Sequence, residues 1–190
     1  MLPYVSSTLS PMAMIGKHIK ELEPDAKVVF IGPCTAKKME IKRETVAPYI
    51  DSAITFEELQ ALLDSREIDI TALEEMPLEN ASYFGRIFAR SGGLTEAVKE
   101  GIKEQGIEDF ELTPVVCEGI EQCKIALLKL RRNMLGGNFV EGMACQGGCV
   151  NGNGCLTHMA KSRMDVENHG KAAGNKTIEN AINDAREPIS

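Results

Sequence analysis

Apolar residues recur along the chain with two alternating periods, one typical of helices and one of buried strands. Residues 11–23 carry apolar side chains at helical spacing, and Ser10 with Pro11 forms the start expected of a helix. Residues 27–32, KVVFIG, are a continuous apolar run typical of a buried parallel strand. The same criteria predict strands over 51–56 and 112–119, and helices over 56–65 (capped by Thr55), 72–75, 91–104, 120–132 and 176–186. Residues 139–143 are either a fourth strand or an extended approach to the cysteines.

Strands that alternate with helices predict an α/β protein with a mainly parallel open sheet flanked by helices. The length of 190 residues fits one domain, or one lobe of a larger one, and is sufficient to bury a core. A hydrophobic content of 43% and a charged content of 26% are those of an ordinary globular protein, so the composition does not indicate any other class of protein.

Charge and apolar runs exclude some functions. The net charge of −7 argues against binding nucleic acid, whose phosphates attract a basic surface. No apolar run approaches the roughly 18 residues of a membrane span. The first residues, MLPYVSSTLSPM, lack a basic segment followed by an apolar one, so they do not resemble a signal peptide. We therefore expect a cytoplasmic protein, in which six cysteines serve metal binding or catalysis rather than disulfides.

Three cysteines lie in two loops that follow predicted strands. Cys34 is in IGPCTAKKME, and Cys145 and Cys149 are in EGMACQGGCVNGNGC. In an open α/β sheet, ligands collect outside the carboxyl ends of the strands. We therefore expect the two loops to meet at one edge, around a shared cofactor.

The spacing of Cys145 and Cys149 suits a metal site, because side chains four residues apart on a helical turn point the same way. Gly147 and Gly148 leave room for an inorganic cluster and offer backbone N–H groups to its sulfides. Zinc is the alternative, although it usually takes CxxC pairs, and His158 is the single histidine nearby. From the residues alone, both metals stay open.

The other cysteines carry weaker signals. Cys117 lies in a predicted strand and Cys123 in the helix that follows, and we expect both to be small core residues. Cys155 is either a third ligand or sensor thiol, or a loop residue. The three histidines show no pattern, and we expect them to be solvent-exposed.

Lys37 follows Cys34 by three residues, at the mouth of the expected site. A buried ammonium group needs a partner, and an anionic ligand on a metal would be one. Glu40 is either a surface charge or the group that holds Lys37 in place.

Together these stretches resemble the catalytic domain of iron-only (FeFe) hydrogenases, in family order over nearly the whole chain. The family's second cysteine motif has the form P-C-T-x-K-K-x-E, and residues 33–40 are PCTAKKME. Its third has the form E-x-M-A-C-x-x-G-C-x-x-G, and residues 141–152 are EGMACQGGCVNG. Residues 5–11, VSSTLSP, and 87–98, IFARSGGLTEAV, are similar to two further family segments.

The resemblance implies a cofactor and its ligands. Cys34, Cys145 and Cys149 match three of the four thiolates that hold a 4Fe–4S subcluster, and Cys149 matches the bridge to a two-iron subcluster carrying CO, cyanide and a dithiolate. The two subclusters together are the H-cluster. A chain with this resemblance is expected to bind iron through these three cysteines.

The resemblance also implies roles for four other residues. Lys37 would hydrogen-bond a cyanide, and Met143 would pack beside the two-iron subcluster. Ser6 matches a serine in the family's proton path, and Glu40 would brace the pocket. These four are the expected catalytic residues.

The departures from the family pattern indicate a divergent subgroup. The first motif, T-S/A-C-C-P, has no match, and Gly32, Leu9 and Met12 replace the residues of well-studied members. We expect residues 1–190 to be a truncated C-terminal lobe that lacks the first cysteine motif and the ferredoxin-like domains. We also expect the chain on its own to be largely free of cluster, because one ligand is missing.

The expected function is that of a fragment of an iron-only hydrogenase, an oxidoreductase that reversibly reduces protons to H2 with ferredoxin electrons. The implied partners are ferredoxin or N-terminal ferredoxin-like domains, and the hydrogenase maturation proteins. Two alternatives stay open: a non-catalytic hydrogenase-like iron–sulfur protein of cluster assembly or sensing, and a zinc-binding interaction module. Metal analysis separates them, since iron with acid-labile sulfide differs from stoichiometric zinc.

Overall fold

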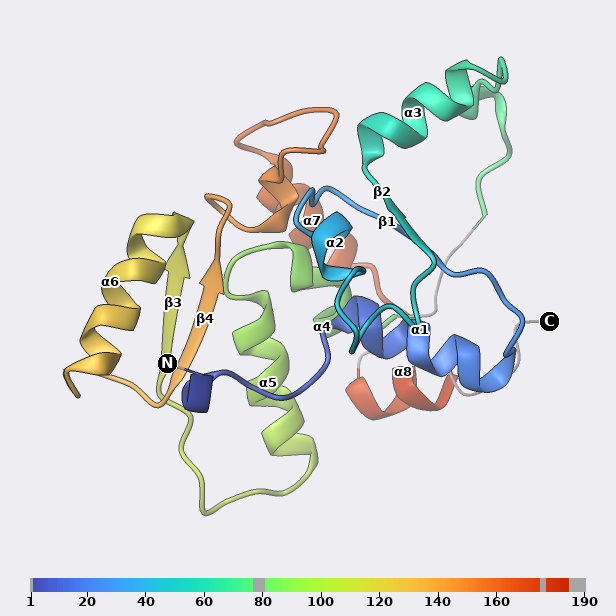
Figure 1. Cartoon of the computed structure of the whole chain (residues 1–190). Helices are drawn as coiled ribbons and strands as arrows, with labels where there is room; N and C mark the ends of the chain where they lie inside the picture. The colour runs from blue at the N-terminus through green and yellow to red at the C-terminus, as the bar shows by residue number, and fades with distance from the viewer. Residues whose placement is uncertain (1, 77–80, 175–176, 185–190) are drawn as a thin grey trace. The chain divides into compact units, whose positions relative to one another are not determined.

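A computed structural model describes residues 2–76, 81–174 and 177–184 (Figure 1). The chain divides into two compact units, each described here by itself. The first unit comprises Met1–Glu75 with Gly152–Thr157, and the second comprises Met76–Asn151 with His158–Ser190. No helix within the described ranges is long and apolar enough to cross a bilayer.

The first unit holds two short parallel strands between helices. β1 pairs with β2 in a register that places Phe30 opposite Ala53. In chain order its elements are η1 (Leu2–Tyr4), α1 (Pro11–Leu22), β1 (Val29–Ile31), α2 (Lys37–Glu40), β2 (Ser52–Ile54), α3 (Phe56–Asp64) and η2 (Ile70–Ala72).

The core of the first unit lies between α1 and the segment before β2. Its buried residues are Met12, Ala13, Val28, Val46 and Ile50. Gly16 lets α1 approach this segment closely, because a Cβ atom there would lie 2.3 Å from Ile50 Cδ1. The apolar residues of α1 therefore pack on the loop that leads into β2.

The second unit holds the other parallel pair, in which Cys117 lies opposite Gly142. α6 packs against both of these strands (Figure 1). In chain order its elements are α4 (Tyr83–Arg86), η3 (Ile87–Ala89), α5 (Gly93–Glu104), β3 (Pro114–Glu118), α6 (Gly119–Arg131), β4 (Phe139–Met143), η4 (Cys149–Asn151), α7 (Ser162–Lys171) and α8 (Ile178–Asp184).

The α/β class and the parallel pairing are confirmed, and so are the predicted starts of α1 and α3. Ser10 caps α1 by accepting a hydrogen bond from the Ala13 amide at 3.3 Å. Thr55 forms a capping box with Glu58 at the start of α3. The expected single sheet is corrected: within the described residues the four strands form two separate two-stranded sheets.

Most predicted helices begin and end within two residues of their expected bounds, and one predicted helix is not formed. The helix over 72–75 is wrong, because the Asp69 carboxylate accepts from the Thr71 amide and hydroxyl and starts a 3-10 turn two residues earlier, at Ile70–Ala72. Leu73 is then already extended. The terminal helix is confirmed as α8, while residues 176, 185 and 186 of the prediction lie outside the described residues.

Candidate metal centre

The Cys34 loop, residues 32–40, begins where β1 ends. The Gly32 amide still donates to the Ile54 carbonyl of β2 at 3.1 Å, so the loop starts from the parallel pair. The Cys34 carbonyl accepts from the Lys37 amide at 3.3 Å, which closes the turn that leads into α2. The Pro33 carbonyl accepts from the Gly154 amide at 3.0 Å. Cys34 is thus a half-buried thiol on a loop fixed at both ends.

Lys37 and Glu40 form an ion pair in this loop, with Lys37 Nζ 2.6 Å from Glu40 Oε2. The Ser10 hydroxyl donates to the other carboxylate oxygen of Glu40. Burial raises the pKa of the Glu40 carboxyl, but the hydrogen bonds from Lys37 and Ser10 outweigh it and hold the pKa below its ordinary value. Of the two roles expected for Glu40, the structure supports the one in which it holds Lys37.

The neighbouring lysine has a different partner. Lys38 pairs with Glu58 of α3, and both side chains are more exposed than those of Lys37 and Glu40. Ser6, the expected proton-path residue, is exposed, and its hydroxyl accepts from the Thr8 amide at 3.2 Å. Lys37 is therefore the lysine whose partner lies within the Cys34 loop, whereas the partner of Lys38 lies outside it.

The Cys145–Cys149 loop, residues 144–149, follows β4 in the second unit. The Gly148 amide donates to the Cys145 carbonyl at 3.1 Å, and Gly147 and Gly148 have φ values of 77° and 107°. The expected helical turn is therefore wrong, because these two glycines adopt left-handed backbone that a helix does not contain. Met143, the last residue of β4, is half-buried.

Gly148 lies directly against the backbone of the segment that precedes α5. A Cβ atom at position 148 would lie 2.5 Å from the Ser91 amide nitrogen and 2.7 Å from the Ala89 carbonyl oxygen. The Ser91 amide also donates to the Gly147 carbonyl at 3.0 Å. Only glycine fits this contact, so the loop and the turn before α5 are held together.

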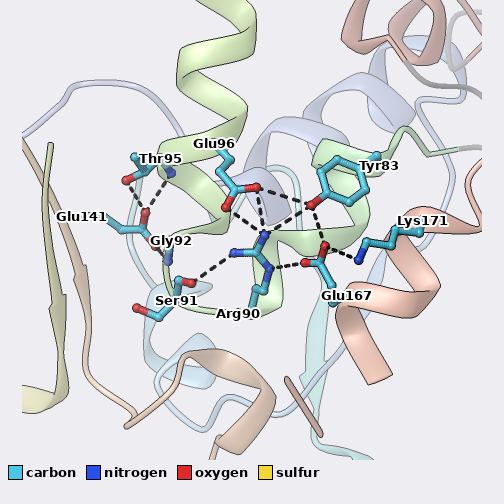
Figure 2. Close-up of polar contacts among 9 residues, drawn as sticks. All are labelled: Tyr83, Arg90, Ser91, Gly92, Thr95, Glu96, Glu141, Glu167 and Lys171. Atoms are coloured by element: carbon cyan, nitrogen blue, oxygen red, sulfur yellow. Dashed lines mark hydrogen bonds and ion pairs between the residues drawn. The ribbon is translucent and has the colours of Figure 1, made fainter. Parts of the chain in front are cut away.

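A buried carboxylate fixes that turn from the other side. Glu141 of β4 is 1% exposed, and its two oxygens accept from the amides of Gly92 and Thr95, each at 2.8 Å (Figure 2). The Thr95 hydroxyl donates to it at 2.6 Å. A carboxylate at a helix N-terminus satisfies amides that have no partner within the helix. Sequence reasoning missed Glu141, although a glutamate within an apolar strand and a helix that opens on two glycines were visible signals.

A second polar network surrounds Arg90 (Figure 2). Its side chain is 7% exposed and pairs with Glu96 and Glu167, each at 2.9 Å. Tyr83 donates its hydroxyl to Glu167 at 2.9 Å. Burial lowers the pKa of the Arg90 guanidinium, but its hydrogen bonds to Glu96 and Tyr83 outweigh this and raise it. This network was also missed, because Glu167, which joins it from α7, lies 77 residues from Arg90 in the sequence.

Two buried polar atoms beside the Cys145–Cys149 loop have no hydrogen-bond partner within the described residues: Ser91 Oγ and Asn151 Oδ1. Asn151 is held against the loop by its amide, which donates to the Gln146 carbonyl at 3.1 Å. Thiolates suit iron–sulfur clusters, glycines leave space beside them, and an unpartnered hydroxyl can donate to cluster sulfur. These residues therefore fit one side of an iron–sulfur site.

The remaining cysteines and the histidines are placed as follows. Cys117 is buried as expected. Burial raises the pKa of its thiol, and the neighbouring Cys123 raises it further. Cys123 is only half-buried, and its thiol lies 3.8 Å from the Met143 carbonyl. Cys155 is buried in the first unit. Of the histidines expected to be exposed, His158 and His169 are, whereas His18 on α1 is half-buried.

The three predicted ligands are divided between the units. Cys34 belongs to the first unit, and Cys145 and Cys149 belong to the second. Among the described residues, no group of three or more His, Cys, Asp or Glu side chains is arranged to hold a metal ion. The structure thus describes each cysteine loop separately, and a shared site remains a prediction.

Comparison with known proteins identifies relatives for most of the chain. The family model described as "Iron only hydrogenase large subunit, C-terminal domain" matches residues 1–153. Iron hydrogenase 1 of Clostridium pasteurianum is 30% identical over 81% of this chain and 34% of its own length. Cytosolic iron-sulfur assembly component 3 of Mus musculus is 24% identical over 82% of this chain and 42% of its own length. The chain spans less than half the length of these curated relatives.

Solved structures give the same fold. A variant of the FeFe-hydrogenase HydA1 from Chlamydomonas reinhardtii superposes with a TM-score of 0.66 at 21% identity, over 97% of this chain and 65% of that one. A structure of HydA(deltaEFG) gives a TM-score of 0.63 at 22% identity, over 92% of this chain and 61% of that one. At such identities the likeness concerns the fold. With the match over residues 1–153, the chain belongs to the family of the iron-only hydrogenase large subunit, C-terminal domain.

Proposed function

We propose that Cys34, Cys145 and Cys149 supply thiolate ligands to a 4Fe–4S cluster linked to a two-iron subcluster. In this proposal the whole protein is an oxidoreductase that reversibly reduces protons to H2 in the cytoplasm, with electrons from ferredoxin or ferredoxin-like domains. The observation that carries the proposal is the pair of cysteine loops. Each follows the carboxyl end of a parallel strand, and each is fixed by polar contacts that leave its thiols half-buried.

The thiolates are the ligands that the cofactor requires. Iron in such clusters prefers soft sulfur donors, and backbone amides and nearby hydroxyls tune its potential. Gly147 and Gly148 keep side chains away from the Cys145–Cys149 loop, and Ser91 Oγ is the unpartnered donor beside it. When bound, the cofactor would pass on electrons received from ferredoxin and would provide the metal site at which protons are reduced.

Lys37 is proposed to donate to an anionic ligand of the two-iron subcluster. Its ammonium group has three donors, and Glu40 occupies one of them at 2.6 Å. The ion pair therefore orients Lys37 and leaves it able to donate elsewhere. Glu40 acts by holding the ammonium group, and the Ser10 hydroxyl holds Glu40 in turn.

Two further residues have proposed roles. Met143, half-buried at the end of β4, would give the subcluster an apolar neighbour. Ser6 is an exposed hydroxyl that can both accept and donate a proton at Oγ, as a relay requires. Because the chain spans 34% of the clostridial relative, we propose that residues 1–190 act as a C-terminal lobe, with a further ligand and the electron path supplied by the rest of the protein. Hydrogenase maturation proteins would install the two-iron subcluster.

The second candidate is a non-catalytic iron–sulfur protein of cluster assembly. It is favoured by relatives that carry this name, including the mouse component and Protein NAR1 of Arabidopsis thaliana, which is 28% identical over 80% of this chain. The same cysteines would bind a cluster in such a protein, and H2 would not be formed. The two candidates differ in chemistry rather than in fold.

The test is to produce the whole protein together with hydrogenase maturation proteins, and to measure H2 evolution and infrared bands of CO and cyanide. We expect both in the wild type and neither in Cys149→Ser, because a serine oxygen is a poor substitute for a thiolate that bridges to the subcluster. Cys117→Ser is the matched control, since that thiol lies in the core. Iron and sulfide without H2 or these bands would support cluster assembly instead, and stoichiometric zinc would contradict both.

A further inference from the structure

Helix α7 lies beyond the residues that match the family, and it packs against the segment that precedes α5, which in turn contacts the Cys145–Cys149 loop. The family match ends at residue 153, and α7 begins at Ser162. Gly170 lets α7 approach closely, because a Cβ atom there would lie 2.7 Å from Ile87 Cγ2 and 3.1 Å from a ring carbon of Tyr83. α7 also packs against η3 and η4, and η4 begins at Cys149.

The contact between α7 and this segment is charged as well as steric. Glu167 of α7 accepts from Arg90 Nε at 2.9 Å and from the Tyr83 hydroxyl at 2.9 Å (Figure 2). Lys171 lies 3.4 Å from the same carboxylate, and Glu96 pairs with the other side of the Arg90 guanidinium. The Arg90 side chain, which is 7% exposed, and Lys171 thus balance the charges of the two carboxylates Glu96 and Glu167. Removing a carboxylate from a buried cation is costly, because the cation keeps its desolvation penalty.

Arg90 connects this network to the cysteine loop through the next residues in the chain. Arg90 Nη1 donates to the Ser91 carbonyl at 3.4 Å, and the Ser91 amide donates to the Gly147 carbonyl. Glu141 of β4 holds the adjacent Gly92 amide. The turn is therefore fixed by α7 on one side and by β4 on the other, and the loop is attached to it.

We propose that α7 is a clamp that positions the Cys145–Cys149 loop, with Glu167 as the positioning residue that acts through Arg90 and the turn at Ser91. The clamp acts on the loop itself, so it does not depend on which group the two thiols bind. It gives the segment after the family match a function at the site. Glu167 touches neither cysteine in this mechanism and acts only by holding Arg90.

The test uses the metal-free chain, so that its outcome is independent of the proposed hydrogen chemistry. Glu167→Gln keeps the size of the side chain and removes its charge. We expect the Ser91 amide to exchange with deuterium about tenfold faster, and Cys145 and Cys149 to be alkylated faster by a similar factor, because the loop opens more often. Mass spectrometry reads both quantities for each residue. Tyr83→Phe, which removes only one donor to Glu167, should produce a smaller change in the same direction.

Glu100→Gln is the matched control, because Glu100 pairs with Lys103 at 3.0 Å in the same unit and does not contact Arg90. It should leave both rates at wild-type values. Unchanged rates in Glu167→Gln would overturn the clamp. A uniform increase at all six cysteines would overturn it too, because Glu167 would then support the fold as a whole rather than this loop.

Discussion

The two cysteine loops are held in different ways. The Cys34 loop is braced by a partly exposed ion pair three residues apart, Lys37 with Glu40, and by one hydroxyl from Ser10. The Cys145–Cys149 loop rests on a buried carboxylate and a buried guanidinium whose partners lie 46 and 77 residues away in sequence. The ion pair of the first loop is local and partly accessible to solvent, whereas the charged groups behind the second loop are buried and have partners distant in sequence.

Because the two loops are held differently, substitutions in them should differ in their effects on function and on stability. A partly exposed ion pair contributes little to stability, so Lys37 can be replaced without loss of the fold. Buried charges that lose a partner are costly, so the groups around the Cys145–Cys149 loop should be important for folding. We therefore expect substitutions at the first loop to affect function more than stability, and those at the second to affect both.

The largest effect on stability is expected for Glu141→Ala. This change leaves the amides of Gly92 and Thr95 and the Thr95 hydroxyl without their acceptor, in a site that is 1% exposed. The free energy of unfolding should fall by about 3 kcal/mol, as measured by urea denaturation. Glu121→Ala, at an exposed position on α6, is the control and should change it by less than about 0.5 kcal/mol. Equal effects would remove the contrast between buried and exposed carboxylates.

Ser10→Ala tests the first loop and should have an intermediate effect. It removes the cap of α1 and the hydroxyl that donates to Glu40. A loss of about 1 kcal/mol is expected in the same denaturation experiment. Ser7→Ala, at an exposed position nearby, should leave stability unchanged. If Ser10→Ala cost as much as Glu141→Ala, the first loop would not be the weakly held one.

Acidification should weaken the first unit through Asp51. The hydrogen bond from Lys20, and then that from the Val28 amide, lowers the pKa of Asp51 from 3.8 to about 2. A carboxyl group whose pKa is lower in the folded state stabilises the protein above its unfolded pKa, and this contribution is lost as the pH falls through the folded value. As the pH is lowered from about 4 to about 2, the urea concentration at the unfolding midpoint should therefore decrease. This decrease should be less steep in Asp51→Asn. The same slope in both proteins would mean that Asp51 does not contribute.

The smallest change in stability is expected for Lys37→Met, below about 0.5 kcal/mol, because its partner Glu40 can take up water instead. The change in function should nevertheless be large, since the ammonium donor to the subcluster is lost. Infrared bands of cyanide and CO in the maturated whole protein should weaken or shift. Lys38→Met, whose partner is Glu58, should leave them unchanged. If Lys37→Met showed the same infrared bands and H2 turnover as the wild type, Lys37 would be a surface charge without a role at the subcluster.

Features that depend on residues close together in the sequence were predictable, and features that depend on distant residues were not. The starts of α1 and α3 were predictable because Ser10 and Thr55 cap amides only three residues away. The pairing of strands into two sheets, rather than one, depends on tertiary contacts that no local pattern records. The same reason explains why the Arg90 network was missed, since Glu167 lies 77 residues from Arg90.

The candidate site shows the same division. Cys34, Cys145 and Cys149 are predicted ligands because each lies in a short motif that can be read within a few residues, and the ion pair of Lys37 with Glu40 spans three residues. The helical turn expected for the third motif failed because spacing alone does not reveal backbone conformation. Gly147 and Gly148 take positive φ values, and their closeness to the turn at Ser91 explains why glycine is needed at position 148.

The central claim is that these three cysteines hold an iron–sulfur cluster, and the iron and acid-labile sulfide content of the whole protein tests it most directly. We predict that the wild type contains both, and that a variant with Cys34, Cys145 and Cys149 all replaced by serine contains neither. The double variant Cys117→Ser/Cys123→Ser should retain the wild-type content, since these residues are not proposed ligands. Equal iron and sulfide in the wild type and the triple variant, or zinc in place of iron, would contradict the claim.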